Sequence, residues 1–418
     1  MKEMISLEEA RALVCGAVAP TEVETVPLLE AVGRPVAADL KSDIDVAPFA
    51  HSAMDGFALR AAEIAAAAED APATLRVVAE IGAGDVFDGV IGPGECVRIM
   101  TGACLPADAD AVVKYEIVGV VEGDGKTGSL VSFTAPAKVG ANVRPAGEEA
   151  RAGEVIVRAG EVISAAGVGF LAGCGVLEVP VCRRPRVAII ATGSELVPAS
   201  EVPGPGKIRN SNSYAMAACA REAGAEAHML PIVEDTFEAL RDAVAAATRD
   251  YDFVVTTGGA ANGDYDFIKP VVAELGELMM TTVSMRPGKA QTFGVVNGTP
   301  VFGLPGNPAA AYVGFQMLIR PALRTMQGYT FMDHPVVRAR LTADEKNRDP
   351  RRIFLRANLT RASDGTYEVT PAKNQSSGLF GPIQKTNCMA VMPDGTEPQP
   401  AGSVVDCILL DVPEEVCL

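Results

Sequence analysis

Residues 186–195 read Arg-Val-Ala-Ile-Ile-Ala-Thr-Gly-Ser-Glu, an apolar run that ends in a small, glycine-bearing turn. A short β-branched run of this kind is typical of a strand that is buried on both faces of a sheet. Further along the chain, a second apolar strand is expected over residues 252–257, and helices are expected over residues 212–223, 237–249 and 266–275. Strands that alternate with helices predict an α/β domain with a parallel sheet.

Two further turns of the same kind follow later strands, Thr257-Gly258-Gly259 and Gly303-Leu304-Pro305-Gly306-Asn307-Pro308. In an open parallel sheet, ligands bind beyond the carboxyl ends of the strands, where helix N-termini offer free N–H groups to anions. A single glycine turn can simply separate a strand from a helix, but three in one domain favour a phosphate or oxyanion site. The candidate contacts are Gly193, Ser194, Gly258, Gly259, Gly306 and Asn307.

Acidic side chains accompany two of these turns, because Glu195 follows the first and both Asp264 and Asp266 follow the second. Carboxylate oxygens are the ligands that a Mg²⁺ ion bridging phosphates needs. Asp264 or Asp266 can instead cap the helix that follows. Asp235, together with Glu238, is expected to cap the second of the predicted helices.

Two cations lie three residues apart in Arg286-Pro287-Gly288-Lys289, around a Pro-Gly turn. Cations on a loop are usually solvated, but these two can instead supply local positive charge to a bound anion. The chain as a whole carries 36 Lys and Arg against 53 Asp and Glu, a net charge of −17. Such a charge opposes sequence-independent attraction to nucleic acid or anionic lipid, so an anionic ligand must be held by local groups.

The length of 418 residues predicts several domains. The nine cysteines include no C-x-x-C pair, and only three His accompany them, so a structural zinc site is not expected. Their odd number, without a basic and then apolar N-terminal signal, favours reduced thiols and a cytoplasmic location. The longest uncharged apolar stretch, over residues 162–177, has 16 residues. It is shorter than the roughly 20 that a membrane-spanning helix needs.

Outside the α/β section the pattern is mostly that of strands. A capping box over Ser6–Glu9 precedes an amphipathic N-terminal helix. Short β-branched runs predict a β-rich region over residues 23–180, with one Ala-rich helix at about residues 60–69. Asn297-Gly298 between two apolar runs predicts a hairpin, and a long helix is expected over residues 309–326. The remainder of the chain then reads as a small all-β domain.

Eight motifs, in one order along nearly the whole chain, resemble those of the molybdopterin molybdenumtransferases, the family of bacterial MoeA and the gephyrin E-domain. Because eight motifs keep their order, the resemblance is far more specific than any single glycine-rich turn. The motifs are Ser52-Ala53-Met54-Asp55-Gly56-Phe57-Ala58, Arg98-Ile99-Met100-Thr101-Gly102-Ala103, Ala109-Asp110-Ala111-Val112-Val113, Asn142-Val143-Arg144, Thr192-Gly193-Ser194-Glu195-Leu196, Thr257-Gly258-Gly259, Pro287-Gly288-Lys289 and Gly303-Leu304-Pro305-Gly306-Asn307-Pro308.

The resemblance implies an elongated, multidomain α/β and β protomer that forms a homodimer. It also implies four domains, of which the α/β domain has three layers and is similar to the molybdopterin-binding fold. The implied domains are a β-rich linker and dimerisation domain over residues 20–42 and 147–179, an inserted β-rich domain over residues 43–146, the α/β domain over residues 1–19 and 180–327, and a C-terminal all-β domain over residues 328–418.

The activity that the resemblance implies is the Mg²⁺-assisted reaction of adenylylated molybdopterin with molybdate, which gives molybdenum cofactor and AMP. It also implies contact with the molybdopterin adenylyltransferase, and loops at Asp55 and Thr101 that the other subunit contributes. The implied site residues are Asp55, Thr101, Asp266 and Lys289 for catalysis, Glu195 and Asp266 for the metal, and Arg286, Lys289, Arg356 and Ser377 for the oxyanion.

The chain also departs from the family pattern near the implied ligand. Ala261 and Ala310 stand where the family usually has serines, so two hydroxyl donors are missing. Two alternatives therefore stay open, a paralogue that prefers tungstate and a non-catalytic protein that binds the pterin nucleotide or acts as a scaffold. The presence of Glu195, Asp266 and Lys289 favours a catalyst, since loss of catalysis would tolerate their replacement.

Overall fold

The computed structural model describes residues 2–258 and 267–410. The chain forms two compact units. The first unit comprises Met1–Glu24, Gly160–Val162 and Pro180–Leu418, and the second comprises Thr25–Ala159 and Ile163–Val179. Neither unit is continuous in sequence, so the chain leaves the first unit near residue 24 and returns to it for good near residue 180.

The second unit is built mainly on a six-stranded sheet. Its order is β7-β4-β6-β5-β9-β8; one of its faces buries Phe57 and Phe133, and the other buries Val97 and Ile99. Strands form along the β-rich region predicted over residues 23–180, which confirms that prediction. The strands are β4 (Gly56–Leu59), β5 (Ala73–Ile81), β6 (Glu95–Ile99), β7 (Ala111–Lys114), β8 (Val118–Glu122) and β9 (Leu130–Phe133), with a 3₁₀ turn, η3 (Tyr115–Ile117), between β7 and β8.

The Ala-rich helix predicted over residues 60–69 is wrong. The structure has only one 3₁₀ turn there, η2 (Ala61–Ile64), followed by a β-bridge between Ala68 and Ala71. Ala61, Ile64 and Ala67 are buried in the core of the sheet. Helix propensity is a weak preference, and packing of these small residues against the sheet overrides it.

Short pairs of strands and one helix complete this part of the chain. The helix α2 (Ala165–Gly173) begins at Ser164, whose hydroxyl accepts a hydrogen bond from the Gly167 N–H. The remaining elements are β1 (Val23–Pro27) paired with β12 (Glu178–Cys182), η1 (Leu28–Ala31), β2 (Leu40–Lys41) paired with β11 (Val155–Val157), and β3 (His51–Ser52) paired with β10 (Val143–Arg144).

The first unit contains a six-stranded sheet of order β16-β13-β17-β21-β20-β18. Its strands are β13 (Arg186–Ala191), β16 (Glu226–Met229), β17 (Phe253–Thr257), β18 (Gly276–Thr282), β20 (Ala290–Val296) and β21 (Thr299–Leu304). The predicted parallel sheet holds for β16, β13, β17 and β21, whereas β20 runs antiparallel to both of its neighbours, β21 and β18. The hairpin causes this reversal, and both Asn297 (φ 53°) and Gly298 (φ 81°) have the positive φ that such a turn requires.

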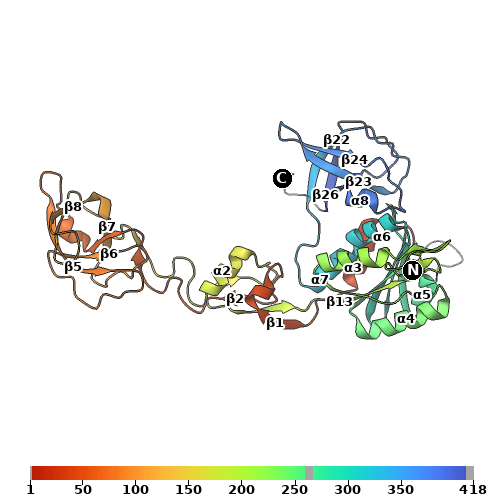
Figure 1. The fold of residues 1–418 in the computed structure, drawn as a ribbon, viewed down its shortest axis with the longest axis horizontal. Coiled ribbons are helices and arrows are strands. Elements are labelled where there is room, and N and C mark those ends of the chain that lie inside the picture. The colour runs from red at the N-terminus through yellow and green to blue at the C-terminus, as the bar shows by residue number, and fades with distance from the viewer. Residues whose placement is uncertain (1, 259–266, 411–418) are drawn as a thin grey trace. The chain divides into compact units, whose positions relative to one another are not determined.

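Helices cover both faces of this sheet and give the expected three layers (Figure 1). Val187 and Ile189 face α1 (Leu7–Gly16), α3 (Asn212–Glu222), α6 (Pro308–Gly314) and α7 (Arg320–Met326). Ala188 and Ile190 face the opposite way and pack against α4 (Phe237–Asp250) and α5 (Ile268–Leu275). Successive residues of a strand point to opposite faces, which is why β13 is apolar throughout.

The helix termini bear out two details of the sequence. Ser6 and Glu9 form the predicted capping box at the start of α1. The long helix predicted over residues 309–326 is formed as α6 and α7 joined by a π-helical turn, Phe315–Ile319. The eight cysteines in the described part of the chain are free, as expected. Among the described residues, no helix combines the length and the apolar character of a membrane span.

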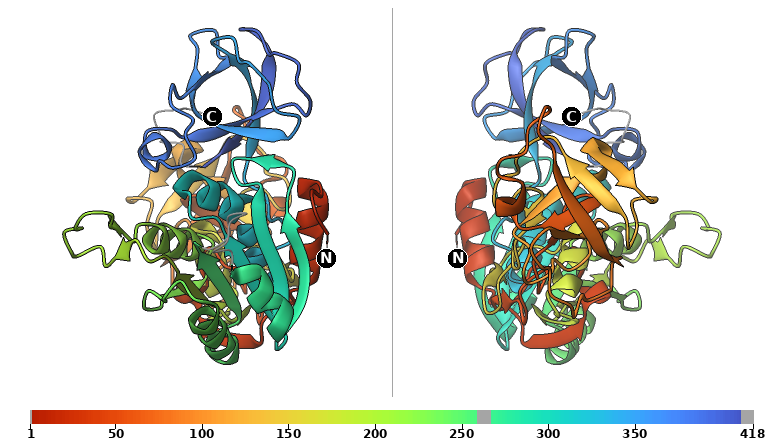
Figure 2. Two further views of the ribbon diagram at one scale, coloured as in Figure 1. Left: turned by 90° about the vertical axis from the view of Figure 1, so that its right-hand side faces the viewer. Right: turned by 90° about the vertical axis from the view of Figure 1, so that its left-hand side faces the viewer.

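The C-terminal part of the first unit is a strongly curved all-β domain, as predicted. Its sheet has the order β19-β23-β24-β22-β26-β25, and a further pairing of β23 with β25 closes the ring into a barrel. Figure 2 shows these strands, in blue, curving around a common centre. Its elements are β19 (Met285–Arg286), β22 (Val336–Leu341), β23 (Arg352–Arg361), β24 (Tyr367–Pro371), α8 (Gly381–Gln384), β25 (Cys388–Met392) and β26 (Val404–Leu409).

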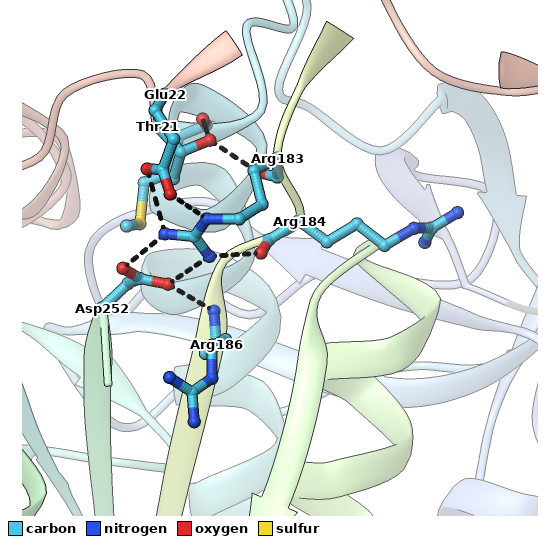
Figure 3. A network of polar contacts seen from close by, with 7 residues as sticks. Thr21, Glu22, Arg183, Arg184, Arg186 and Asp252 are labelled. Carbon is cyan, nitrogen blue, oxygen red and sulfur yellow. Dashed lines mark hydrogen bonds and ion pairs between the residues drawn. The ribbon is translucent and has the colours of Figure 1, made fainter. Parts of the chain in front are cut away.

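Arg183 links Glu22 and Asp252, close to the two points where the chain passes between the units (Figure 3). Its guanidinium donates two hydrogen bonds to the Asp252 carboxylate, at 2.8 and 2.9 Å, and also pairs with Glu22. The Arg186 N–H donates to the same aspartate at 2.6 Å. Burial raises the pKa of Asp252, but the hydrogen bonds from Arg183 and Arg186 outweigh burial and leave the pKa below its ordinary value.

Candidate functional site

The carboxyl ends of three neighbouring parallel strands surround a cavity of about 660 Å³ in the first unit. The turns after β13, β17 and β21 all contribute to its wall, together with the start of α3. Of the residues predicted for this site, Gly193, Glu195, Gly258, Gly306 and Asn307 line the cavity. The sheet brings these turns together because parallel strands end at the same edge.

Three of the residues predicted for this site are not among those that the structure places around the cavity. Ser194 is exposed and does not line the cavity, and its carbonyl accepts a hydrogen bond from the Lys207 ammonium. Gly259 and Asp266, like Ala261, lie outside the described residues.

Gly258 is required where β17 passes close to the end of β13. Its φ of +96° lies in the left-handed region, and a Cβ placed on it would come within 2.1 Å of the Thr192 carbonyl oxygen. A backbone atom cannot move aside as the end of a flexible side chain can. The cavity wall therefore depends on a glycine at this position.

Asn212, which the sequence predicts only as the start of a helix, links two of the turns that line the cavity. Its Nδ2 donates to the Thr257 Oγ1 at 2.8 Å and to the Gly306 carbonyl at 2.9 Å. The Asn212 Oδ1 and the Thr192 Oγ1 are buried and have no hydrogen-bond partner among the described residues. Buried polar atoms are normally satisfied, so this pair is suited to a ligand that donates hydrogen bonds. An amide at a helix start facing the strand ends was the signal for it.

Two carboxylates share this cavity, Glu195 and Asp235. Burial raises the pKa of Asp235, and the charge of Glu195 raises it further. The expectation that Asp235 caps the helix is wrong, because the cap of α4 is Thr236, whose hydroxyl accepts a hydrogen bond from the Ala239 N–H at 3.3 Å. Thr, like Asp, suits the N-cap position. The helix begins one residue later than predicted, and Asp235 lines the cavity instead.

The chemistry of these two carboxylates fits a divalent cation that prefers oxygen ligands. Both line the cavity, and each holds negative charge near the other, which a cation would offset. The described residues contain no group of three or more His, Cys, Asp or Glu side chains that can hold a metal ion. Further ligands from the described chain would therefore have to be neutral oxygens or the substrate.

A second cavity, of about 650 Å³, lies between the α/β domain and the C-terminal barrel of the same unit. Pro305 and Asn307 line both cavities, so the two adjoin. The four residues predicted to contact the oxyanion all line this cavity, although 91 positions of sequence separate the first from the last. They are Arg286, Lys289, Arg356 and Ser377, and Ala310 lines the same cavity.

Arg356 is the most buried cation of this cavity, with 2% of its surface exposed. Its Nη2 donates to the Ser376 carbonyl at 3.3 Å, while its buried Nε has no partner. No carboxylate lies within 4 Å of the guanidinium among residues 2–258 and 267–410. Burial, and then the charge of Arg286, lower the pKa of Arg356 to about 10. A buried, uncompensated cation of this kind is suited to bind an anion.

The other cations of the cavity differ in their partners. Arg286 and Arg351 both pair with Asp349, at 3.5 Å in the case of Arg286. The hydrogen bonds from Arg351 lower the pKa of Asp349 to about 2. Lys289 lines the cavity and is exposed, with no carboxylate partner in the described part of the chain. Lys346 also lines the cavity and is exposed, with no carboxylate partner among the described residues, so Lys289, Lys346 and Arg356 offer the positive charge that is free for a ligand.

Gln375 holds the segment that carries Ser376 and Ser377 against β23. Its Oε1 accepts from the Arg356 N–H at 3.1 Å, and its Nε2 donates to the Arg356 and Ala372 carbonyls, each at 2.9 Å. The Ser377 carbonyl accepts a hydrogen bond from the Ala309 N–H at 2.8 Å. These contacts fix the serine segment between the barrel and the α/β domain.

Asp55 and Thr101 lie in the second unit and contact one another. The Thr101 N–H and hydroxyl both donate to the Asp55 Oδ1 at 2.7 Å. The bond from the hydroxyl, followed by the bond from the N–H, lowers the pKa of Asp55. This carboxylate is therefore ionised and held in one orientation at the start of β4. Its role in another subunit's site stays a prediction.

Comparison with known proteins gives matches along nearly the whole chain. The sequence matches the family models "MoeA N-terminal region (domain I and II)" over residues 5–175, "Probable molybdopterin binding domain" over residues 188–325 and "MoeA C-terminal region (domain IV)" over residues 338–410. The molybdopterin molybdenumtransferase of Bacillus subtilis (strain 168) is 36% identical over 407 residues, which cover 97% of this chain and 94% of that protein.

A second relative and a solved structure agree with these matches. The molybdopterin molybdenumtransferase of Staphylococcus aureus (strain COL) is 34% identical over 388 residues, which cover 93% of this chain and 91% of that protein. A crystal structure of the molybdopterin biosynthesis MoeA protein from Pyrococcus horikosii has a TM-score of 0.83 at 31% identity, covering 97% of this chain and 99% of that one. The chain belongs to the molybdopterin molybdenumtransferases, transferases of molybdenum cofactor biosynthesis.

Proposed function

We propose that the protein inserts the metal of molybdate into adenylylated molybdopterin and releases AMP in a Mg²⁺-dependent reaction. The observation that carries the proposal is the uncompensated Arg356, buried beside Lys289 in a cavity that adjoins a second cavity lined by carboxylates. A reaction between an anionic nucleotide and an oxyanion needs this combination. Cations hold the oxyanion, and a divalent ion beside the carboxylates offsets the charge of the phosphates.

The residues divide between two tasks in this proposal. Gly193, Ser194, Gly258, Gly259, Gly306 and Asn307 form the turns that receive the pterin nucleotide, while Arg286, Lys289, Arg356 and Ser377 hold the oxyanion. Glu195, with Asp266 and Asp235, would hold Mg²⁺, which supplies Lewis-acid stabilisation of the departing phosphate. Asn212 and Thr192 orient the heterocycle through their unpaired oxygens.

The departure of AMP leaves negative charge on its phosphate. The carboxylates cannot stabilise that negative charge directly, so their role is to bind the cation. Lys289 lines the oxyanion cavity, as Asn307 does, and offsets negative charge there. We further propose that the active species is a cytoplasmic homodimer in which Asp55 and Thr101 complete the site of the other subunit. We also propose that it receives its substrate by contact with the adenylyltransferase.

The test is AMP release from adenylylated molybdopterin with Mg²⁺, run with molybdate, with tungstate and without oxyanion. Release that requires molybdate, and that is lost on chelation of Mg²⁺, is the expected result. The Asp266→Asn variant should bind the nucleotide with little turnover. Nucleotide binding without AMP release in any arm would contradict the proposal and favour a binding protein. Preferential release with tungstate would favour the tungstate alternative, which no comparison supports.

A further inference from the structure

Gln291 is a fully buried amide beneath the cationic turn Arg286–Lys289. It lies in β20, directly after the turn, and none of its surface is exposed. Its Nε2 donates a hydrogen bond to the Gly288 carbonyl at 3.0 Å. Its Oε1 is buried with no partner among the described residues. Burying an amide that is only half satisfied is costly, so this residue calls for an explanation.

The surroundings of Gln291 make room for its amide on two sides. A Cβ placed on Gly314, in α6, would come within 2.6 Å of the Nε2 and 2.7 Å of the Oε1. A Cβ placed on Gly288 would come within 2.7 Å of the Nε2. The amide therefore lies close to both the turn and the helix, at positions where any side chain larger than glycine would displace it.

This hydrogen bond fixes the orientation of the peptide that joins Gly288 to Lys289. The C=O and N–H of a trans peptide point in opposite directions, and the described cis peptides do not include this one. Because the Gly288 carbonyl points to the buried amide, the Lys289 N–H points away from it. Lys289 itself is exposed and lines the oxyanion cavity.

We propose that Gln291 is a positioning residue that holds the Lys289 N–H toward the cavity as a fixed donor to the oxyanion. The inference rests on the proposed function and extends it. The Lys289 and Arg356 side chains supply positive charge, whereas a backbone N–H supplies a hydrogen-bond donor with a fixed orientation. A donor that is already oriented needs no reorganisation when the anion binds. Since Ala310 offers no hydroxyl to this cavity, an oriented backbone donor matters more there.

The experiment compares two variants that act on the same hydrogen bond from opposite sides. Gln291→Met keeps most of the volume and removes the donor, and Gly314→Ala displaces the amide with a methyl group. The matched control is Gln316→Met, which removes another buried amide, one that bonds His334 at 2.9 Å and does not line the oxyanion cavity. Molybdate affinity is measured by calorimetry, and AMP release gives the KM for molybdate and kcat.

Both test variants should weaken molybdate binding by about fivefold, the effect of one hydrogen bond, and raise the KM for molybdate by a similar factor. Nucleotide affinity should stay unchanged, and the control should match the wild type in molybdate affinity. Equal loss of nucleotide and molybdate affinity would indicate a merely structural role and overturn the inference, as would unchanged molybdate affinity in both variants. If the wild type binds no oxyanion, the proposed function itself fails.

Discussion

Replacing Arg356 by methionine should stabilise the protein while it abolishes oxyanion binding. Arg356 is buried and lacks a carboxylate partner, and its pKa falls from 12.5 to about 10. Since each pKa unit corresponds to about 1.4 kcal/mol, the charged form costs the folded protein roughly 3–4 kcal/mol. Methionine removes this cost but gives up the hydrogen bond to the Ser376 carbonyl, worth about 1 kcal/mol. The bonds of Gln375 involve only the Arg356 backbone and remain.

The expected net change is a gain of about 2–3 kcal/mol in the free energy of unfolding without oxyanion, within the range seen when buried charges are replaced by apolar residues. Urea unfolding followed by far-UV circular dichroism measures it, with the slope checked for a single transition. Molybdate at about 100 times its Kd should stabilise the wild type by about 2.7 kcal/mol and leave the variant unchanged.

Arg351→Met is the matched control, because Arg351 lines the same cavity but is paired with Asp349. Its loss leaves a carboxylate without its main partner, so this variant should be destabilised by about 1–3 kcal/mol. If Arg356→Met instead lost more than about 2 kcal/mol without oxyanion, the guanidinium would be a compensated structural group. The reasoning about an anion site would then be refuted. A variant that molybdate still stabilised would refute the assignment of Arg356 to that site.

Three further tests, one of them with a control variant, probe other features. Asp235→Asn should weaken Mg²⁺ binding by about tenfold in a calorimetric titration, whereas Thr236→Ala, beside it, should lose about 1 kcal/mol of stability with unchanged Mg²⁺ affinity. Arg183→Met should cost about 1–3 kcal/mol at neutral pH. Because the folded pKa of Asp252 is lowered, this difference should be full above pH 3.8 and shrink as the pH falls through the lowered value in acid unfolding. Gly258→Ala should lower the unfolding free energy by about 3 kcal/mol or more, from the contact of its methyl with a backbone oxygen.

The parts of the fold that follow from local chemistry could be predicted from the sequence. The hairpin at Asn297-Gly298 was predictable because few other dipeptides accept positive φ at both positions. The capping box at Ser6–Glu9 was equally local. The Ala-rich segment at residues 60–69 failed, because its short apolar side chains pack against a sheet whose strands lie elsewhere in sequence. The pairing of β23 with β25 that closes the barrel has no local signal either.

The candidate site likewise has residues that the sequence could identify and residues whose role depends on the folded structure. Motif resemblance brought Arg286, Lys289, Arg356 and Ser377 together, and the structure places all four around one cavity. The prediction that Asp235 caps the helix was wrong, because Asp and Thr are both good N-caps and the sequence alone does not choose between adjacent positions. The roles of Asn212 and Gln291 depend on orphaned oxygen atoms and on the space left by distant glycines, and neither is visible before the chain is folded.

The division of the first unit into separate stretches of chain also constrains how it is made on the ribosome. The helix α1 packs against the π-helical turn Phe315–Ile319 and against α7, which are synthesised about 300 residues later. At 5–20 residues per second, roughly 15 to 60 seconds pass before those partners emerge. During that interval the apolar stripe of Leu7, Ala10 and Val14 lacks these partners. The sheet of the second unit can meanwhile form from chain already made, so this unit can fold before the amino-terminal segment meets the partners that stabilise its helix.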